Sequence, residues 1–223
     1  MYEPVALNIA TVTALLLWPL VSLILFNTLS LPKAIGWTII GGQMLLPVGA
    51  IIKLPVIPGL DKNSVPSIVA LVACIFLGAR VVRARQKFGI VEVLLAMYVI
   101  GPLITSLLND DTIRIGFDKI IPGVGIYDGV SSALASAIWI IPFLLGRRHM
   151  RSFDCNAEVL RILVFAGLAY SILLLIEIRF SPQFHYWLYG YSPSQFAQSQ
   201  RDGGYRPMAF MGHGLIAAFF MMT

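Results

Sequence analysis

The sequence predicts an all-α fold, a polytopic bundle of transmembrane helices. Hydrophobic residues make up 58% of the 223 residues and charged residues only 12%, and the mean hydropathy is +0.83. A water-soluble domain of this length could not bury that much apolar surface. Several apolar runs also approach the roughly 20 residues that a helix needs to cross about 30 Å of hydrocarbon.

About seven apolar segments follow one another along the chain. They cover about residues 5–26, 35–52, 65–82, 89–108, 127–146 and 159–178, and a last one begins near 208. Gly41, Gly42 and Pro47 interrupt the second segment, which a membrane helix tolerates when neighbours satisfy the freed backbone groups. Pro207 suits the first turn of the last helix. No internal repeat is visible, so we expect residues 1–223 to form one transmembrane domain.

Lysine and arginine residues predict the orientation. They cluster at residues 80–87, between the third and fourth segments, and at 147–151, between the fifth and sixth. The two loops share a side by parity, and basic loops favour the cytoplasm. The loop at 109–128 and the segment at 179–207 then lie on the outer face. Lys53 and Lys62 oppose this assignment mildly.

The last apolar segment is too short to cross a membrane. About 16 residues follow its start before the sequence ends at Thr223, fewer than the roughly 20 that a span needs. We therefore expect a sequence truncated at its carboxyl end. We also expect this part to be inactive alone, because residues that follow the last helix would be missing from its outer site.

Arginines and histidines gather in the outer segment at 179–213 and make it the candidate site. Arg201 and Arg206 flank Gly203 and Gly204 just ahead of Pro207. Arginine binds phosphate through a planar fork of N–H donors, and a helix N-terminus adds free N–H groups. The pattern favours a pyrophosphate clamp. The alternative is that these arginines anchor the chain at the lipid headgroups.

Three further residues complete the candidate site. His213 is expected about two turns inside the last helix, where it could bind a phosphate oxygen or a sugar hydroxyl, act as a general base, or bond a neighbouring helix. Arg179 adds positive charge at the end of the sixth segment. Glu177 could orient one of the arginines, and both Glu177 and Arg179 could equally be interfacial anchors.

Other polar and aromatic residues are expected to be structural. The stretch containing Tyr186, Trp187, Tyr189 and Tyr191 favours a membrane-interface belt over a surface that packs on sugars, and His185 beside it is expected to be solvated. The remaining expectations concern residues elsewhere in the chain: a solvated loop for Asp110, Asp111, Asp118 and Asp128, and hydrogen bonds within the bundle for Gln43 and Glu92.

Several classes of function are not indicated. The net charge of +5 sits in short inter-helix clusters, which orient membrane helices and do not indicate a nucleic-acid partner. The two cysteines, Cys74 and Cys155, make no metal-ligand spacing, and the acidic loop matches no defined calcium site. We therefore expect no metal and no cofactor.

The motif that begins at Arg201 resembles a known family. Its pattern is Arg201-x-x-Gly204-x-Arg206-Pro207 followed by Phe210 and His213, and it resembles the amino-terminal portion of the O-antigen ligase and polysaccharide polymerase superfamily. The string from Glu177 through Arg179 to Ser181-Pro182-Gln183 is similar to a subgroup from bacterial exopolysaccharide loci, and residues 60–62 and 122–128 fit its outer loops.

The resemblance implies a helical glycosyltransferase of the GT-C type in the bacterial inner membrane, with a periplasmic active site. Such enzymes move a glycan from undecaprenyl pyrophosphate to a hydroxyl of an acceptor glycan or glycolipid. Arg201 matches the arginine of the family motif, and Gly204 its glycine. Arg206 and His213 would supplement it, although His213 stands where an asparagine is common.

Two other functions remain open. A transporter or flippase of lipid-linked glycans would bind the same anion without breaking a bond, and transporters often contain two related halves. A non-catalytic membrane scaffold would need none of the arginines to contact a substrate. A second outer loop rich in arginine and histidine would favour the transferase, whereas a repeated half would favour transport.

Overall fold

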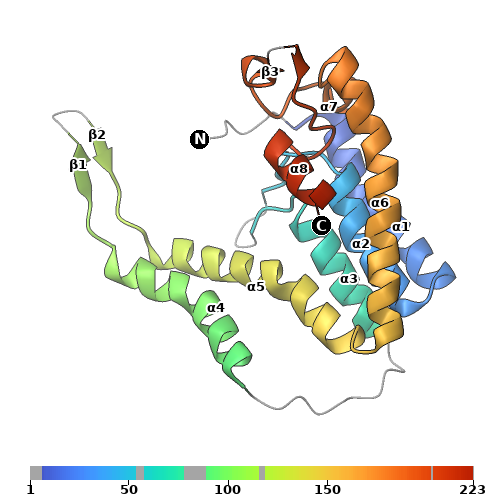
Figure 1. Cartoon of the computed structure of the whole chain (residues 1–223). Coiled ribbons are helices and arrows are strands. Elements are labelled where there is room, and N and C mark those ends of the chain that lie inside the picture. The colour runs from blue at the N-terminus through green and yellow to red at the C-terminus, as the bar shows by residue number, and fades with distance from the viewer. Residues whose placement is uncertain (1–6, 54–57, 78–88, 116–118, 202, 223) are drawn as a thin grey trace.

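The computed structural model describes residues 7–53, 58–77, 89–115, 119–201 and 203–222. Four of its helices are long and apolar enough to cross a membrane: α1 (Ile9–Thr28), α4 (Ile90–Leu108), α5 (Ile126–His149) and α6 (Phe153–Phe180). The others are shorter: α2 (Leu31–Leu45), α3 (Ser64–Phe76), α7 (Phe184–Tyr189) and α8 (Gly214–Met222). The prediction of a helical membrane bundle is confirmed at this level (Figure 1).

Small residues let the first helices pack closely. Asn8 caps α1, because its side chain accepts the Thr11 N–H at 2.9 Å. Gly42 of α2 faces α3, where a Cβ would lie 2.3 Å from Cγ of Pro66. Close approach through glycine is typical of membrane helices. The indole N–H of Trp18 in α1 donates to the Thr38 carbonyl of α2 at 3.2 Å, so α1, α2 and α3 form one packed unit.

The second apolar segment does not continue as a helix to residue 52, as the sequence suggested. The helix α2 ends at Leu45, because Pro47 disfavours the helical conformation of the residue before it, and Gly49 has a positive φ of 79°. In the described residues of the connection to α3, 46–53 and 58–63, one bridge joins Ile52 and Leu60 and the rest is irregular.

Two helices form a hairpin that leans away from the rest of the bundle (Figure 1). The helix α4 packs along α5, which in turn packs on α3. A small antiparallel ribbon, β1 (Ile113–Ile115) and β2 (Lys119–Ile121), lies between them in the chain. Near the other end, Glu92 and Arg147 form an ion pair at 2.6 Å, which confirms the expected bond of Glu92 within the bundle.

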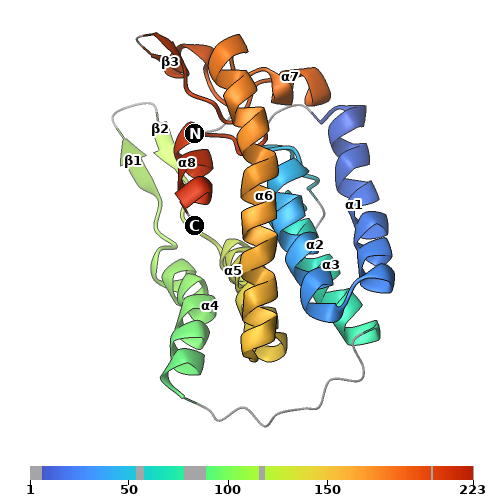
Figure 2. The ribbon, with the colours of Figure 1, turned by 45° about the vertical axis from the view of Figure 1, so that its right-hand side comes forward.

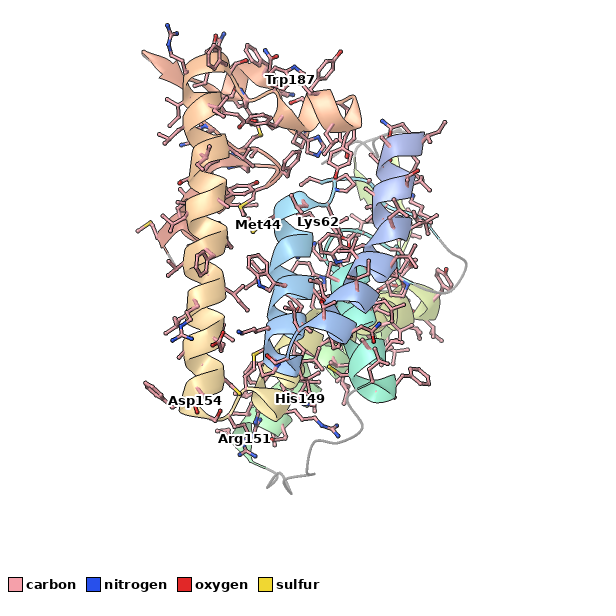
Figure 3. All side chains as sticks on the ribbon, turned by 90° about the vertical axis from the view of Figure 1, so that its right-hand side faces the viewer. Met44, Lys62, His149, Arg151, Asp154 and Trp187 are labelled. Carbon is pink, nitrogen blue, oxygen red and sulfur yellow. The ribbon has the colours of Figure 1, made fainter. Side chains whose placement is uncertain are left out.

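The polar segments gather at two opposite ends of the molecule. Figure 2 shows α6 running from one end to the other, with α7 and β3 at its far end. Arg151 and Asp154 lie at one end and Trp187 lies at the other (Figure 3). The basic cluster at 80–87 lies outside the described residues. The placement of Arg151 and Trp187 at opposite ends agrees with the predicted parity of their two loops, and their sidedness in a membrane remains a prediction.

Candidate anion-binding site

A buried carboxylate anchors the segment that carries the candidate residues. Residues 181–213, here called the cap, cover the end of the bundle where α6 finishes. Glu177 of α6 is only 1% exposed. One carboxylate oxygen accepts the N–H groups of Met208 at 2.9 Å and Ala209 at 2.7 Å, and the other accepts the N–H of Phe184 at 3.2 Å. One side chain therefore fixes both the start and the end of the cap.

The geometry gives Glu177 a different role from the one expected. Ala209 has a positive φ of 44°, and this turns two successive N–H groups toward the same oxygen. Within the part of the chain that the structure describes, the three partners of Glu177 are backbone groups and none is an arginine. Its carboxylate shapes the backbone before α8 and does not orient a guanidinium group there.

Two more side chains hold the same turn. Residues 208–213 form a buried loop, here called the clamped turn. The Tyr170 hydroxyl accepts the Phe210 N–H at 2.8 Å, and the ammonium group of Lys62 donates to the Phe210 carbonyl at 2.8 Å. Lys62 approaches from the 46–63 connection and lies just beneath the cap (Figure 3). Three side chains from two distant parts of the chain therefore fix the turn.

Lys62 is an uncommon cation because it is 7% exposed. Burial disfavours the charged form, and the pKa of Lys62 falls to about 8 although Asp61 beside it acts in the opposite direction. No carboxylate of the described residues pairs with it. The Asp61 carboxylate accepts the N–H groups of Asn63 and Ser64 at the start of α3.

His213 lies just before α8, and the expectation that it lies two turns inside a helix is wrong. Its carbonyl accepts the Ile216 N–H at 3.0 Å, and its Nδ1 accepts the Leu215 N–H at 3.2 Å. The histidine therefore caps α8, which begins at Gly214. The clamped turn replaces the expected first turns of the helix, so Pro207 is not in the first turn either.

Arg206 lies against the first residue of α8. A Cβ on Gly214 would lie 2.1 Å from Cγ and 2.3 Å from Cδ of Arg206, so the absence of a side chain at Gly214 lets the arginine stem pack there. The Arg206 N–H donates to the Ser199 carbonyl at 2.7 Å. Its guanidinium group makes no hydrogen bond or ion pair with the described residues, and it remains available to an anion.

Arg201 and Gly204 lie in a small hairpin that rests on α6, the helix that carries Arg179 near its end. Strands β3 (Gln200–Arg201) and β4 (Gly204–Tyr205) pair with Arg201 opposite Gly204, and β4 packs on α6. Gly203 has a positive φ of 88°, as the glycine pair predicted. The side chain of Arg201 lies outside the described part of the structure. Arg179 is exposed and has no ion pair among the described residues.

The aromatic stretch divides into two kinds of residue. Tyr186 and Trp187 are exposed, at 58% and 63%, as in a membrane-interface belt. Tyr189 and Tyr191 turn inward, and their hydroxyls donate to the carbonyls of Leu45 and Val48. These two tyrosines tie the cap to the end of α2.

His185 is buried, and the expectation that it is solvated is wrong. It is 2% exposed. Its Nε2 accepts the Val48 N–H at 3.2 Å, and its Nδ1–H donates to the Tyr191 carbonyl at 2.9 Å. Burial lowers the pKa of His185 to about 4, so the ring is neutral near pH 7 and structural in role.

Part of this arrangement could have been predicted from the sequence. Polar side chains in apolar helices commonly face the protein interior, which could have identified Tyr170 and Glu177 as anchors of the turn.

Gln43 donates to Asn63 at 2.9 Å, which confirms its expected role. Asp128 caps α5, Asp110 and Asp111 are exposed, and Asp118 lies outside the described residues. No metal-binding cluster occurs among the described residues.

The arrangement places positively charged side chains around one end of α6 and the start of α8, while the nearest buried carboxylate is already occupied by backbone groups. Such a surface can bind an anion. No protein-family model, curated protein or solved structure matches the chain.

Proposed function

We propose that this chain is part of a bacterial inner-membrane glycan transferase of the GT-C type, an O-antigen ligase or polysaccharide polymerase. The enzyme would move a glycan from undecaprenyl pyrophosphate to a sugar hydroxyl of an acceptor glycan or glycolipid at the periplasmic face. The observation that supports it best is Arg206, which packs on Gly214 at the start of α8 and whose guanidinium group has no partner among the described side chains. The resemblance of the Arg201 motif supports it independently.

The arginines supply the main electrostatic contribution in this proposal. Pyrophosphate is the leaving group, and negative charge increases on it as the glycosidic bond breaks. Guanidinium groups of Arg201 and Arg206 would stabilise that charge through preorganised N–H donors. Arg179 would extend the positive surface from the end of α6. The stem of Arg206 packs on Gly214 directly after the clamped turn, which sets the position of the side chain's base before a substrate binds.

His213 fits a donor role better than a base role in this geometry. Its Nδ1 accepts the Leu215 N–H, so the proton of the neutral ring lies on Nε2. An Nε2–H group donates to a phosphate oxygen or a glycan hydroxyl. A general base for the acceptor hydroxyl would then come from another residue of the full-length protein, or from His213 after the capping bond is released.

The membrane orientation of the proposal is tested by labelling. Trp187→Cys and Arg151→Cys place thiols at the two opposite ends of the bundle (Figure 3). In intact cells, an impermeant maleimide should modify position 187 and leave position 151 unmodified until the cells are lysed. The reverse pattern would place the cap in the cytoplasm and rule out a periplasmic site.

The reaction is tested with purified full-length protein, a lipid-pyrophosphate-linked glycan and an acceptor glycan. We expect the glycan to appear on the acceptor, and Arg206→Ala to reduce the rate about tenfold to a hundredfold, the effect of losing a charge-assisted hydrogen bond. Arg151→Ala, at the opposite end, is the matched control. Translocation of the lipid-linked glycan without a transfer product would instead identify a flippase.

A further inference from the structure

A recess lies between α4 and α5, away from the cap. It has a volume of about 550 Å³, within the range of small-molecule sites. Its lining comes from the carboxyl-terminal half of α4 and the first turns of α5, so it occupies the half of these spans nearest the β1–β2 ribbon. That ribbon and the cap lie toward the same end of the molecule (Figure 2).

Three hydroxyl groups in this recess have no partner within the described residues. They belong to Tyr98 and Thr105 of α4 and to Ser132 of α5. Asp128 adds a carboxylate; among the described residues one of its oxygens accepts a hydrogen bond, from the Gly125 N–H at 3.1 Å, and the other accepts none. A hydroxyl placed in hydrocarbon without a partner is costly, so these groups favour a polar ligand or water at this depth.

The charge of the recess selects the kind of ligand. Its lining contains one carboxylate and no lysine, arginine or histidine, which disfavours phosphate and other anions. Hydroxyls and a carboxylate are the groups that bond neutral sugar hydroxyls. The cap has the opposite character, so the two surfaces suit different ligands.

The surroundings indicate that the ligand is a lipid. Met97 of α4 lines the recess and is 65% exposed, and Ile104 and Leu108 on the same helix are 53% and 76% exposed. In a membrane they would contact acyl chains. A Cβ on Gly101 would meet nothing within 4 Å, so the recess is open at the middle of α4.

We propose that the α4–α5 recess binds the uncharged sugar headgroup of a glycolipid, with the acyl chains lying along α4. Tyr98, Thr105 and Ser132 would bond the sugar hydroxyls, and the free oxygen of Asp128 would accept one of them. If the proposed transfer is correct, this recess holds the glycolipid acceptor. The acceptor role depends on the proposed function, whereas the binding of the glycolipid does not.

The test uses the full-length protein in lipid nanodiscs and a glucosyl diacylglycerol that carries a photoreactive group on the sugar. We expect crosslinks to map to α4 and α5. Gly101→Leu fills the recess and should reduce labelling at least about fivefold, and Thr105→Ala combined with Ser132→Ala should do the same by removing two hydrogen bonds. Gly167→Leu is the matched control, because Gly167 on α6 also has no atom within 4 Å.

Competition identifies the ligand class. Unlabelled glucosyl diacylglycerol should compete, whereas phosphatidylglycerol and free glucose should compete poorly. Equal labelling of Gly101→Leu and Gly167→Leu, or equal competition by phosphatidylglycerol, would overturn the proposal. Arg206→Ala should keep the labelling while it reduces transfer, so a failure of the transferase proposal leaves this result unchanged.

Discussion

Replacing Glu177 with glutamine should loosen the cap without unfolding the helices. The carboxylate accepts three backbone N–H groups at 2.7, 2.9 and 3.2 Å. A glutamine can keep an oxygen toward Met208 and Ala209, but it then presents an NH₂ group to the Phe184 N–H. Two charge-assisted bonds become neutral and one buried donor loses its acceptor, for a total of about 2–5 kcal/mol.

Hydrogen exchange of the cap measures this effect directly. Exchange of the Met208 and Ala209 amides reports the free energy of local opening. At 1.4 kcal/mol for each factor of ten, their protection should fall roughly 30-fold to several thousandfold in Glu177→Gln, while amides in the middle of α6 stay protected. Glu177→Ala should lower this protection further, because all three hydrogen bonds disappear.

Glu158 provides the matched control on the same helix. It forms surface ion pairs with Lys33 at 3.3 Å and Arg161 at 2.7 Å, and exposed pairs contribute little. Glu158→Gln should therefore leave the protection of the cap unchanged. Equal exchange of the Met208 and Ala209 amides in the wild type and in Glu177→Gln would show that Glu177 does not hold the clamped turn.

Three further outcomes follow from the buried groups. The folded-state pKa of His185, about 4, lies below its unfolded value of about 6.5, so between these pH values only the unfolded state binds the proton. The stability of the cap should therefore be full above pH 6.5 and fall by about 3 kcal/mol by pH 4. His185→Gln should reduce this pH dependence, which hydrogen exchange measures. The pKa of Lys62 is about 8 in the folded state and 10.5 in its ordinary, exposed state, so the stability of the cap should rise with pH between these values. Lys62→Met should flatten that rise, and an unchanged pH profile would contradict the burial of Lys62. Gly214→Ala places a Cβ 2.1 Å from Cγ of Arg206, so it should lower transfer nearly as much as Arg206→Ala, whereas Gly167→Ala should not.

The long helices could be predicted because their signal is local. The expected segments at 89–108 and 127–146 agree with α4 and α5 within three residues, and the one at 159–178 lies inside α6, which begins six residues earlier; each is a continuous apolar run. The expected helix from 208 failed for a non-local reason. Its backbone groups bond Glu177, Tyr170 and Lys62, which are 31 to 148 residues away in the chain, and no local pattern contains that information.

The candidate site was predictable in its charges and not in its support. Arg206 and the glycines beside it stood out because guanidinium groups and flexible backbone are typical of phosphate recognition. The packing of Arg206 on Gly214, and the capping of α8 by His213, depend on the clamped turn. His185 was misassigned because its partners, Val48 and Tyr191, are brought together only by the fold.

The most direct test of the account is the affinity of the full-length protein in nanodiscs for undecaprenyl pyrophosphate relative to undecaprenol. Arg201 and Arg206 should favour the pyrophosphate by about tenfold to a hundredfold each, the value of a charge-assisted hydrogen bond. Alanine at either position should remove that residue's tenfold to hundredfold share of the preference, and Arg201→Lys should remove part of the Arg201 share because lysine lacks the bidentate fork. Equal affinity for the two lipids, or an unchanged preference in Arg201→Ala and Arg206→Ala, would show that these arginines anchor the chain at the membrane surface and do not bind the substrate.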